Sequence, residues 1–538
     1  MNIDGVYSEL RLDTFGDWLG VVTDSGKSVL ERSRKPCSWS SSLPVLQRKT
    51  AQIQSFRQKL DANGANSIKN LDSAFKEIAE SSRIASEVVK EESAFAEECY
   101  GQLLFRHEML TPINHIPFFL ILLRFFKIYV TPAMAVAMPL LTVILPYILV
   151  KYVFGIPMPL SVYIGIVKQF YTGNGFKGLM PTPDLDGQLA QVHRSATEGT
   201  QDFLGKMKFY GQTAWLLFSF GQSMWQPIQT ARHLAKLDQT LCSQGEAIRR
   251  IYNNTVTIRN ILEGFHLKVA RLPFEEHEVQ DDRIAVASVL ESPNRFKLLL
   301  ELIGEWEVLF RFASHSDICP VRWITPSESA NCSLRLRNTF DIHVVPQKRV
   351  KISVILHKKT HAILTGPNRG GKSTALRAIG RSVFLAHNYG VAVGEAAAMT
   401  PLDYIQTCLR LEDIPGSASL FEREVAIASL ALQRSQSLRG LVLIDELFHS
   451  TNPPDAEIAS RLFLKQLWAS KQTLSIISTH MFQLLDLGTQ SKVQKLCCPA
   501  SYRTDGSVDY KYGLAKGICT VSSVKEILKE KGFPASRA

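Results

Sequence analysis

Residues 361–374 read His-Ala-Ile-Leu-Thr-Gly-Pro-Asn-Arg-Gly-Gly-Lys-Ser-Thr, and this stretch indicates the fold more strongly than any other part of the chain. It begins with a short apolar run. Residues 366–373 then fit the pattern Gly-x-x-x-x-Gly-Lys-Ser/Thr, and helical spacing follows from Thr374. A strand, a glycine-rich loop and a helix in this order are the context of a phosphate-binding loop, whose backbone N–H groups turn toward phosphate oxygens. The stretch therefore predicts an α/β domain that binds a nucleotide.

The residues of this loop have separate expected roles. We expect Lys372 to reach the β- and γ-phosphates and Ser373 to ligate Mg²⁺, so ATP and Mg²⁺ are the expected cofactors. The candidate nucleotide-binding residues of the loop are Gly366, Pro367, Asn368, Arg369, Gly370, Gly371, Lys372, Ser373 and Thr374.

Two later apolar runs end in residues that suit the same site. Leu-Val-Leu-Ile is followed by Asp445 and Glu446, and Leu-Ser-Ile-Ile-Ser is followed by Thr479 and His480. The carboxyl ends of parallel strands meet at one edge of a sheet, where ligands bind. We expect Asp445 to hold Mg²⁺ through water, Glu446 to orient or deprotonate the attacking water, and His480 to contact the γ-phosphate. The expected catalytic residues are Glu446, His480 and Lys372, and the expected metal ligands are Ser373 and Asp445.

A hydrophobic stretch from His115 to Val167 sets the middle of the chain apart. It contains no acidic residue, and Ile128 to Val150 carries no charge at all. A helix needs about 20 apolar residues to cross the hydrocarbon core of a bilayer. A buried helical hairpin of a soluble protein is the alternative, but such helices usually keep a polar face. We expect a transmembrane hairpin over 111–170, with an even number of crossings or a dip into the bilayer, so that both flanking regions lie on one side.

The flanking regions have the spacing of amphipathic helices. The apolar positions before the stretch are Ile53, Phe56, Leu60, Ile68, Leu71, Phe75 and Ile78, and those after it are Leu234, Leu237, Leu241, Ile248, Ile251, Ile258, Ile261 and Leu262. Basic residues of the second region either contact DNA phosphates or form a solvated helix face, and these are Arg232, Lys236, Arg249, Arg250, Arg259 and Lys268.

Composition narrows the class of protein. Of the 538 residues, 45% are hydrophobic and 21% are charged, which excludes a disordered or fibrous chain. Lys and Arg number 61 against 50 for Asp and Glu, and the net charge of +11 suits nucleic acid or a lipid headgroup surface without choosing between them. The nine cysteines form no Cys-x-x-Cys pair, which argues against a zinc framework and a disulfide scaffold.

The motifs, in this order and spacing, resemble the ATPase domain of the MutS mismatch-repair family, one of the ABC-type ATPases. The resemblance rests on residues 365–374, on Leu-Val-Leu-Ile-Asp-Glu over 441–446 and on Ser-Thr-His-Met over 478–481, and it is strong over about 345–535. Ser419-Leu-Phe-Glu-Arg-Glu resembles the family's signature Ser-Thr-Phe-x-x-Glu. That signature implies a dimer in which Ser419 reaches the nucleotide of the partner protomer.

The chain also departs from the family. Residues 12–57 resemble the start of the family's lever domain, which leaves no room for the mismatch-recognition and connector domains that precede it in the repair proteins. The apolar stretch stands where the family has DNA-clamp helices. Arg369 replaces a Met of the phosphate loop, and Leu-Phe-His-Ser over 447–450 replaces a glycine-rich segment. The resemblance therefore implies a membrane-anchored variant without the two N-terminal domains.

The expected fold class is mixed: an α-helical lever or core domain with an inserted transmembrane hairpin, followed by a C-terminal α/β P-loop ATPase domain of the ABC type. The expected domains are 1–110, the start of the lever; 111–170, the hairpin; 171–315, the helical lever region; 316–344, a linker; and 345–535, the MutS-like ATPase domain.

The expected function is ATP binding and hydrolysis by a dimeric, membrane-associated protein, with mismatched or branched DNA as a candidate ligand. We expect a homodimer in contact with membrane lipid, and a heteromeric partner stays open. The ATPase domain would face the cytosol or an equivalent compartment that contains ATP. The alternative is an ABC-type membrane ATPase that moves or tethers a non-DNA partner, although the chain lacks the Leu-Ser-Gly-Gly-Gln signature of transporters. A tethering protein with a dead nucleotide site is a third class, against which Lys372, Asp445 and Glu446 argue.

Overall fold

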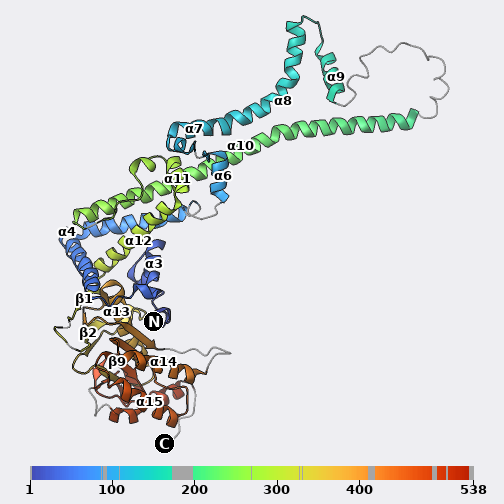
Figure 1. Cartoon of the computed structure of the whole chain (residues 1–538). Coiled ribbons are helices and arrows are strands. Elements are labelled where there is room, and N and C mark those ends of the chain that lie inside the picture. Colours follow the sequence, from blue (N-terminus) through green and yellow to red (C-terminus); the bar gives the residue numbers. More distant parts are fainter. Residues whose placement is uncertain are drawn as a thin grey trace. The chain divides into compact units, whose positions relative to one another are not determined.

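The computed structural model describes residues 3–85, 88, 94–107, 109–171, 198–267, 269–325, 327–329, 331–409, 419–487, 493–504 and 507–531. They form two compact units (Figure 1). The first unit contains residues 1–79, 254–271 and 298–538, and the second contains residues 80–253 and 272–297. The mixed α/β class is confirmed, with helices in both units and every strand in the first.

A six-stranded sheet forms the centre of the C-terminal domain, in the order β13-β10-β4-β9-β8-β7. Each of its strands except β13 runs parallel to its neighbour, and each of the central strands β4, β8 and β9 is buried along its whole length. Continuous apolar strands of this kind are typical of parallel sheets covered on both faces. The strands are β4 (His361–Thr365), β7 (Tyr404–Cys408), β8 (Gly440–Ile444), β9 (Thr473–Ser478), β10 (Val493–Cys497) and β13 (Ala515–Lys516).

A second, five-stranded sheet has the order β3-β2-β6-β1-β5. Its strands are β1 (Ile318–Trp323), β2 (Leu334–Thr339), β3 (Ile352–Leu356), β5 (Val391–Val393) and β6 (Ala396–Met399). Strands β1 and β2 lie in the range that the sequence predicts as a linker, 316–344. They belong to the sheet because alternate side chains such as Leu334 and Leu336 are buried while Arg335 and Arg337 point to solvent. They pair with β5 and β6, which follow more than 50 residues later, so these pairings are non-local.

The N-terminal helices α1 (Ile3–Glu9), α2 (Phe15–Leu19) and α3 (Asp24–Glu31) share one hydrophobic core with the sheets and with α13 (Lys372–Tyr389). Leu10 lies so close to Gly380 of α13 that a Cβ there would come within 2.7 Å of it. Arg381 Nη2 donates to Leu10 O at 2.7 Å. The predicted lever region 1–110 is therefore divided: residues 1–79 belong to the first unit and residues 80–110 to the second.

Helices α4 (Leu43–Ile84), α10 (Glu198–Gly264) and α12 (Pro293–Ser314) are long, and two of them, α4 and α10, carry the predicted apolar spacing. Helix α4 is interrupted at Gly64, whose φ is 75°. The predicted apolar residues of α4 and α10 are buried, except for Ile68 and Ile261, which are partly exposed. The periodicity of 3.6 residues therefore identified these helices correctly.

The second unit contains one continuous apolar helix, Pro117–Val153, built from α7 (Pro117–Phe125), α8 (Thr131–Ile148) and π-helical turns. This helix has 37 residues. Its most apolar part has a mean hydropathy of 2.3, and no residue of that part is buried. Among the described residues it is the one helix long and apolar enough to cross a membrane. The shorter α9 (Leu160–Tyr171) returns along it, since Tyr163 Oη donates to Val143 O. The two-helix transmembrane hairpin stays a prediction.

Candidate phosphate-binding site

The glycine-rich loop connects β4 to α13 as the sequence predicts. Gly371 caps the N-terminus of α13 with a left-handed φ of 95°, a conformation that a glycine adopts without steric cost. Tyr512 lies against the same point, because a Cβ at Gly371 would be 3.6 Å from its ring. Arg369 also has a left-handed φ, 64°, although it carries a side chain. This backbone opens the loop toward a cavity of about 690 Å³.

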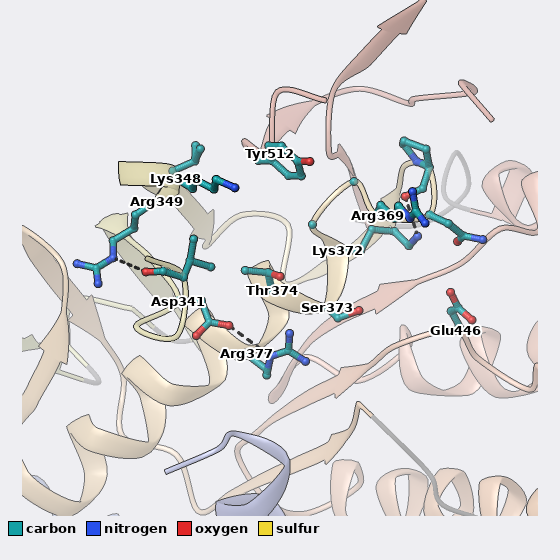
Figure 2. Close-up of a pocket in the computed structure, with 16 residues that line it drawn as sticks. Asp341, Lys348, Arg349, Arg369, Lys372, Ser373, Thr374, Arg377, Glu446 and Tyr512 are labelled. Atoms are coloured by element: carbon teal, nitrogen blue, oxygen red, sulfur yellow. Dashed lines mark hydrogen bonds and ion pairs between the residues drawn. The ribbon is translucent and has the colours of Figure 1, made fainter. Parts of the chain in front are cut away.

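The cavity has charged residues on two sides (Figure 2). Arg369, Lys372 and Glu446 lie on one side, Asp341, Lys348 and Arg349 on the other, and Ser373 and Thr374 between them. The predicted loop residues 367–374 all line the cavity, and Gly366 precedes them at the end of β4. The volume is of the size of a cofactor site.

Lys372 is buried, and its Nζ is held within the chain. It lies 3.3 Å from both Gly366 O and Pro367 O and 3.0 Å from Nε2 of His480. Burial lowers the pKa of Lys372, and the nearby carboxylates of Asp445 and Glu446 oppose that shift. An anionic ligand in the cavity would replace these contacts to neutral carbonyl oxygens with ion pairs.

Asp445 lies at the end of β8 and accepts two hydroxyl hydrogen bonds, from Ser373 Oγ and from Ser478 Oγ. Ser478 Oγ in turn accepts from the backbone N–H of Glu446 at 3.0 Å. No group of three His, Cys, Asp or Glu side chains within the described residues could hold a metal by itself. The hydroxyl and carboxylate oxygens of Ser373 and Asp445 nevertheless suit Mg²⁺, which usually takes one or two protein ligands and completes its shell with water and substrate phosphate.

Glu446 and His480 face each other across the ends of β8 and β9. Oε1 of Glu446 lies 3.2 Å from Nε2 of His480. This hydrogen bond lowers the pKa of Glu446, and the positive charge of Lys372 adds to the effect. The same Nε2 lies 3.0 Å from Nζ of Lys372, and one ring nitrogen cannot accept from lysine and donate to glutamate at once. Nε2 of His480 therefore bonds to one of the two groups at a time, according to the tautomer of the ring.

Ser419 lies outside the cavity of its own chain. It is the N-cap of α14 (Leu420–Ser435), where its backbone N–H donates to Glu422 at 2.9 Å and its Oγ accepts from the Glu422 N–H at 3.2 Å. The structure thus brings five of the predicted catalytic and metal-binding residues together and leaves Ser419 apart. Its contact with a partner's nucleotide stays a prediction.

Several residues at the site were not predicted as site residues. Ser478 anchors Asp445, Tyr512 forms a wall of the cavity, and Asp341 receives hydrogen bonds from two arginines of α13. Asp341 is buried, and burial alone would raise its pKa. The charge of Arg381 lowers it instead, with contributions from the His343 N–H and Arg377. The polar ends of apolar strands were the available signal for Ser478, whereas Asp341 and Tyr512 meet the loop only through the tertiary fold.

Three of the four arginines in α10, Arg249, Arg250 and Arg259, form ion pairs with nearby carboxylates. Arg250 bonds to Glu246 and Arg259 to Glu263, each one turn away, and Arg249 pairs with Asp282 at 3.2 Å. Lys268 lies outside the described residues. These pairs favour a solvated helix face over a phosphate-binding surface.

Comparison with known proteins agrees with this geometry. Residues 362–537 match the family model of MutS domain V. The chain is 27% identical over 321 residues to the DNA mismatch repair protein MSH6 of Arabidopsis thaliana, and the match covers 55% of this chain and 24% of that protein. It is 25% identical over 248 residues to the DNA mismatch repair protein MutS of Streptococcus gordonii, covering 45% of this chain and 29% of that protein. The chain thus spans about a quarter of the length of these relatives.

Proposed function

We propose that this chain binds and hydrolyses ATP with Mg²⁺. One observation carries the proposal: Lys372, Ser373, Asp445, Glu446 and His480, which come from a loop and two strand ends, meet at one edge of the sheet beside the cavity. The match of residues 362–537 to the family model of MutS domain V supports the same activity. The loop N–H groups and Lys372 would bind the phosphates. Ser373 and Asp445 would hold Mg²⁺, which when bound supplies positive charge to the transferred phosphoryl group.

Glu446 and His480 would act on the attacking water. The lowered pKa keeps Glu446 ionised at neutral pH, so its carboxylate can orient the water and accept its proton. His480 would hold Glu446 in place while it donates from Nε2. When the phosphates draw Lys372 away from His480, Nε2 loses that competing contact and is free to donate to Glu446 or to the γ-phosphate, one at a time.

The test is turnover by the Glu446→Gln variant. We expect it to hydrolyse ATP about a hundredfold to ten-thousandfold more slowly while it still binds ATP, because the amide keeps the shape and cannot take a proton. Lys372→Ala should lose binding itself. The control is Glu457→Gln on α15 (Pro453–Leu467), which removes a surface ion pair with Arg461 away from the cavity. Turnover that Glu446→Gln leaves unchanged would refute the assignment.

The dimer is part of the proposal and has its own experiment. Lys372→Ala and Ser419→Ala proteins should each be inactive alone. If Ser419 serves the partner's site, a mixed dimer contains one intact site, with Lys372 from one protomer and Ser419 from the other. Mixing the two inactive proteins should then restore turnover. If mixing restores nothing although mixed dimers form, Ser419 does not act across the interface.

We also propose that the chain acts at a membrane, with the ATPase domain on the cytosolic or an equivalent side. The exposed apolar helix Pro117–Val153 supports this. Mismatched or branched DNA is the proposed ligand, since both relatives are named DNA mismatch repair proteins. Three arginines of α10 already form ion pairs with carboxylates of this chain. These pairs favour the alternative, an ABC-type membrane ATPase that moves or tethers a non-DNA partner. Binding to homoduplex, mismatched and branched DNA, with and without ATP over a salt series, separates the two.

A further inference from the structure

The phosphate loop carries a second cation besides Lys372. Arg369 lines the cavity from a left-handed backbone position, and its side chain is half exposed. Its Nη1 lies 2.7 Å from Oε2 of Glu530, which is half exposed too. In the described part of the chain, Glu530 is the one acidic side chain paired with this guanidinium. An arginine presents five N–H donors, so this contact leaves donors for a further anion.

Glu530 belongs to α17 (Val524–Glu530), and a second glutamate of this helix contacts the segment that leads to Tyr512. Glu526 of the same helix accepts from Tyr510 Oη at 2.7 Å and from the backbone N–H of Val508 at 3.0 Å. The Tyr510 ring stacks on that of Tyr512 with centroids 5.7 Å apart. Tyr512 lines the cavity beside Gly371. One short helix thus contacts Arg369 through Glu530 and, through Glu526, the Tyr510 ring that stacks on Tyr512.

The pair Arg369–Glu530 is placed to respond to a ligand. A terminal phosphate carries more negative charge than a carboxylate and offers oxygens that match the guanidinium fork. The half-exposed ion pair is worth little by itself, so a phosphate within reach of Arg369 can displace Glu530 at small cost. A nucleoside diphosphate lacks that terminal group and would leave the pair intact.

We propose that Arg369 is a specificity residue for the nucleoside triphosphate, and that Glu530 is the internal anion that occupies it while the terminal phosphate is absent. Binding of a triphosphate therefore releases α17 from the loop, and binding of a diphosphate does not. This inference rests on the proposed ATP site. It assigns the preference for triphosphate over diphosphate to Arg369, and the structural response to α17.

The first experiment is calorimetric titration of the full chain with ADP and with the β,γ-imido analogue of ATP, both with Mg²⁺. We expect Arg369→Met to weaken the analogue about tenfold and ADP less than twofold, because only the triphosphate loses a charge-assisted contact. Arg369→Lys should keep part of the preference. Glu530→Gln should strengthen the analogue several-fold, because it raises the fraction of Arg369 available to the ligand. Glu457→Gln is the charge-matched control and should change neither affinity.

The second experiment follows amide hydrogen exchange in α17. In the wild-type chain, exchange should rise with the analogue and not with ADP, and in Glu530→Gln it should be high without nucleotide. If both nucleotides bind but Arg369→Met and Glu530→Gln leave the ratio of their affinities unchanged, the inference is overturned and the ATP site stands. If neither nucleotide binds the wild-type chain, the proposed function fails, and the inference fails with it.

Discussion

The loop after β8 stores backbone strain where Glu446 must be held. Glu446 and Phe448 have φ values of 56° and 51°, in the left-handed region that disfavours residues with side chains. Phe448 is nevertheless buried, with its ring 6.0 Å from that of Phe421 and 6.1 Å from that of Phe463. Aromatic packing therefore fixes, in this chain, a turn that a glycine would adopt freely.

We predict that Phe448→Gly is less destabilising than Phe448→Ala. Both lose the ring, at a cost of about 3–5 kcal/mol, but glycine also relieves about 1 kcal/mol of backbone strain. Urea titration of the detergent-solubilised chain measures the difference. Phe463 in α15 is the matched control: it is equally buried in a helix, where Gly costs about 1 kcal/mol more than Ala. The same order of Gly and Ala at both positions would contradict the strain argument.

His387 makes the stability of the first unit depend on pH. Burial lowers its pKa to about 4, and the neutral ring is fixed by Val383 O at Nδ1 and by the Leu402 N–H at Nε2. The unfolded chain, with an ordinary histidine pKa near 6.5, binds more protons between pH 6.5 and 4. The free energy of unfolding is therefore fully retained above pH 6.5 and falls as the pH drops, by at most about 1.4 kcal/mol per pH unit. His387→Asn should reduce this slope, measured by urea titration at pH 7, 6 and 5.

The control for this slope is His277→Gln, at an exposed position of the second unit. It should leave the pH dependence of unfolding as it is in the wild-type chain. His361, whose pKa burial also lowers to about 4, keeps its own share in both variants. A slope that His387→Asn does not reduce would mean that the buried ring titrates as it does in water.

At the scale of elements, α10 and α11 (Asp282–Glu291) approach with almost no space between their backbones. A Cβ at Gly245 would overlap Asp282 O, so only glycine fits there. Asp238 of α10 is buried between Arg283 of α11 and Arg124 of α7, which ties the apolar helix to the same junction. We predict that Gly245→Ala lowers the free energy of unfolding of the second unit by about 1–3 kcal/mol, which is the usual cost of overpacking a core.

Gly221 gives the matched test within the same helix. A Cβ there would meet no atom within 4 Å, so Gly221→Ala should stabilise α10 by about 0.5–1 kcal/mol. Gly245→Ala should lower the thermal midpoint of the chain and speed amide exchange in α11. Gly221→Ala should raise the midpoint and should not speed that exchange. Equal effects would show that the close contact at Gly245 does not carry the packing.

The elements also show what the sequence predicts and what it does not. Helices α4 and α10 follow from apolar spacing, which is local to each helix. Lys372, Asp445 and His480 were predicted to meet because each follows a short apolar strand, and the carboxyl ends of parallel strands lie at one edge of a sheet. Strands β1 and β2 were assigned to a linker because Pro and Ser residues surround them and because their partners β5 and β6 lie far along the sequence, although β3, the other partner of β2, follows closely. The contact between Arg369 and Glu530 joins positions 161 residues apart and has no local signal.

At the scale of the whole molecule, two features of one chain make different demands on its surroundings: a cavity lined by charged residues and an exposed, largely apolar helix of 37 residues. At about 1.5 Å per residue the helix is about 56 Å long, longer than a bilayer core of about 30 Å. An exposed apolar surface of this size is typical of a site that contacts a membrane or another protein.

We predict that the wild-type chain is recovered with membranes after alkaline carbonate extraction and that Ile144→Glu, in the uncharged centre of the helix, reduces this recovery. A carboxylate at the bilayer centre costs about 2.5–3.5 kcal/mol on insertion scales. Leu462→Glu is the control, because Leu462 is exposed on α15 of the first unit. Nucleotide affinity should be unchanged in Ile144→Glu, since the cavity lies in the other unit. A wild-type chain that stays soluble and monodisperse without detergent would contradict the membrane proposal and leave the ATP site to be judged on its own.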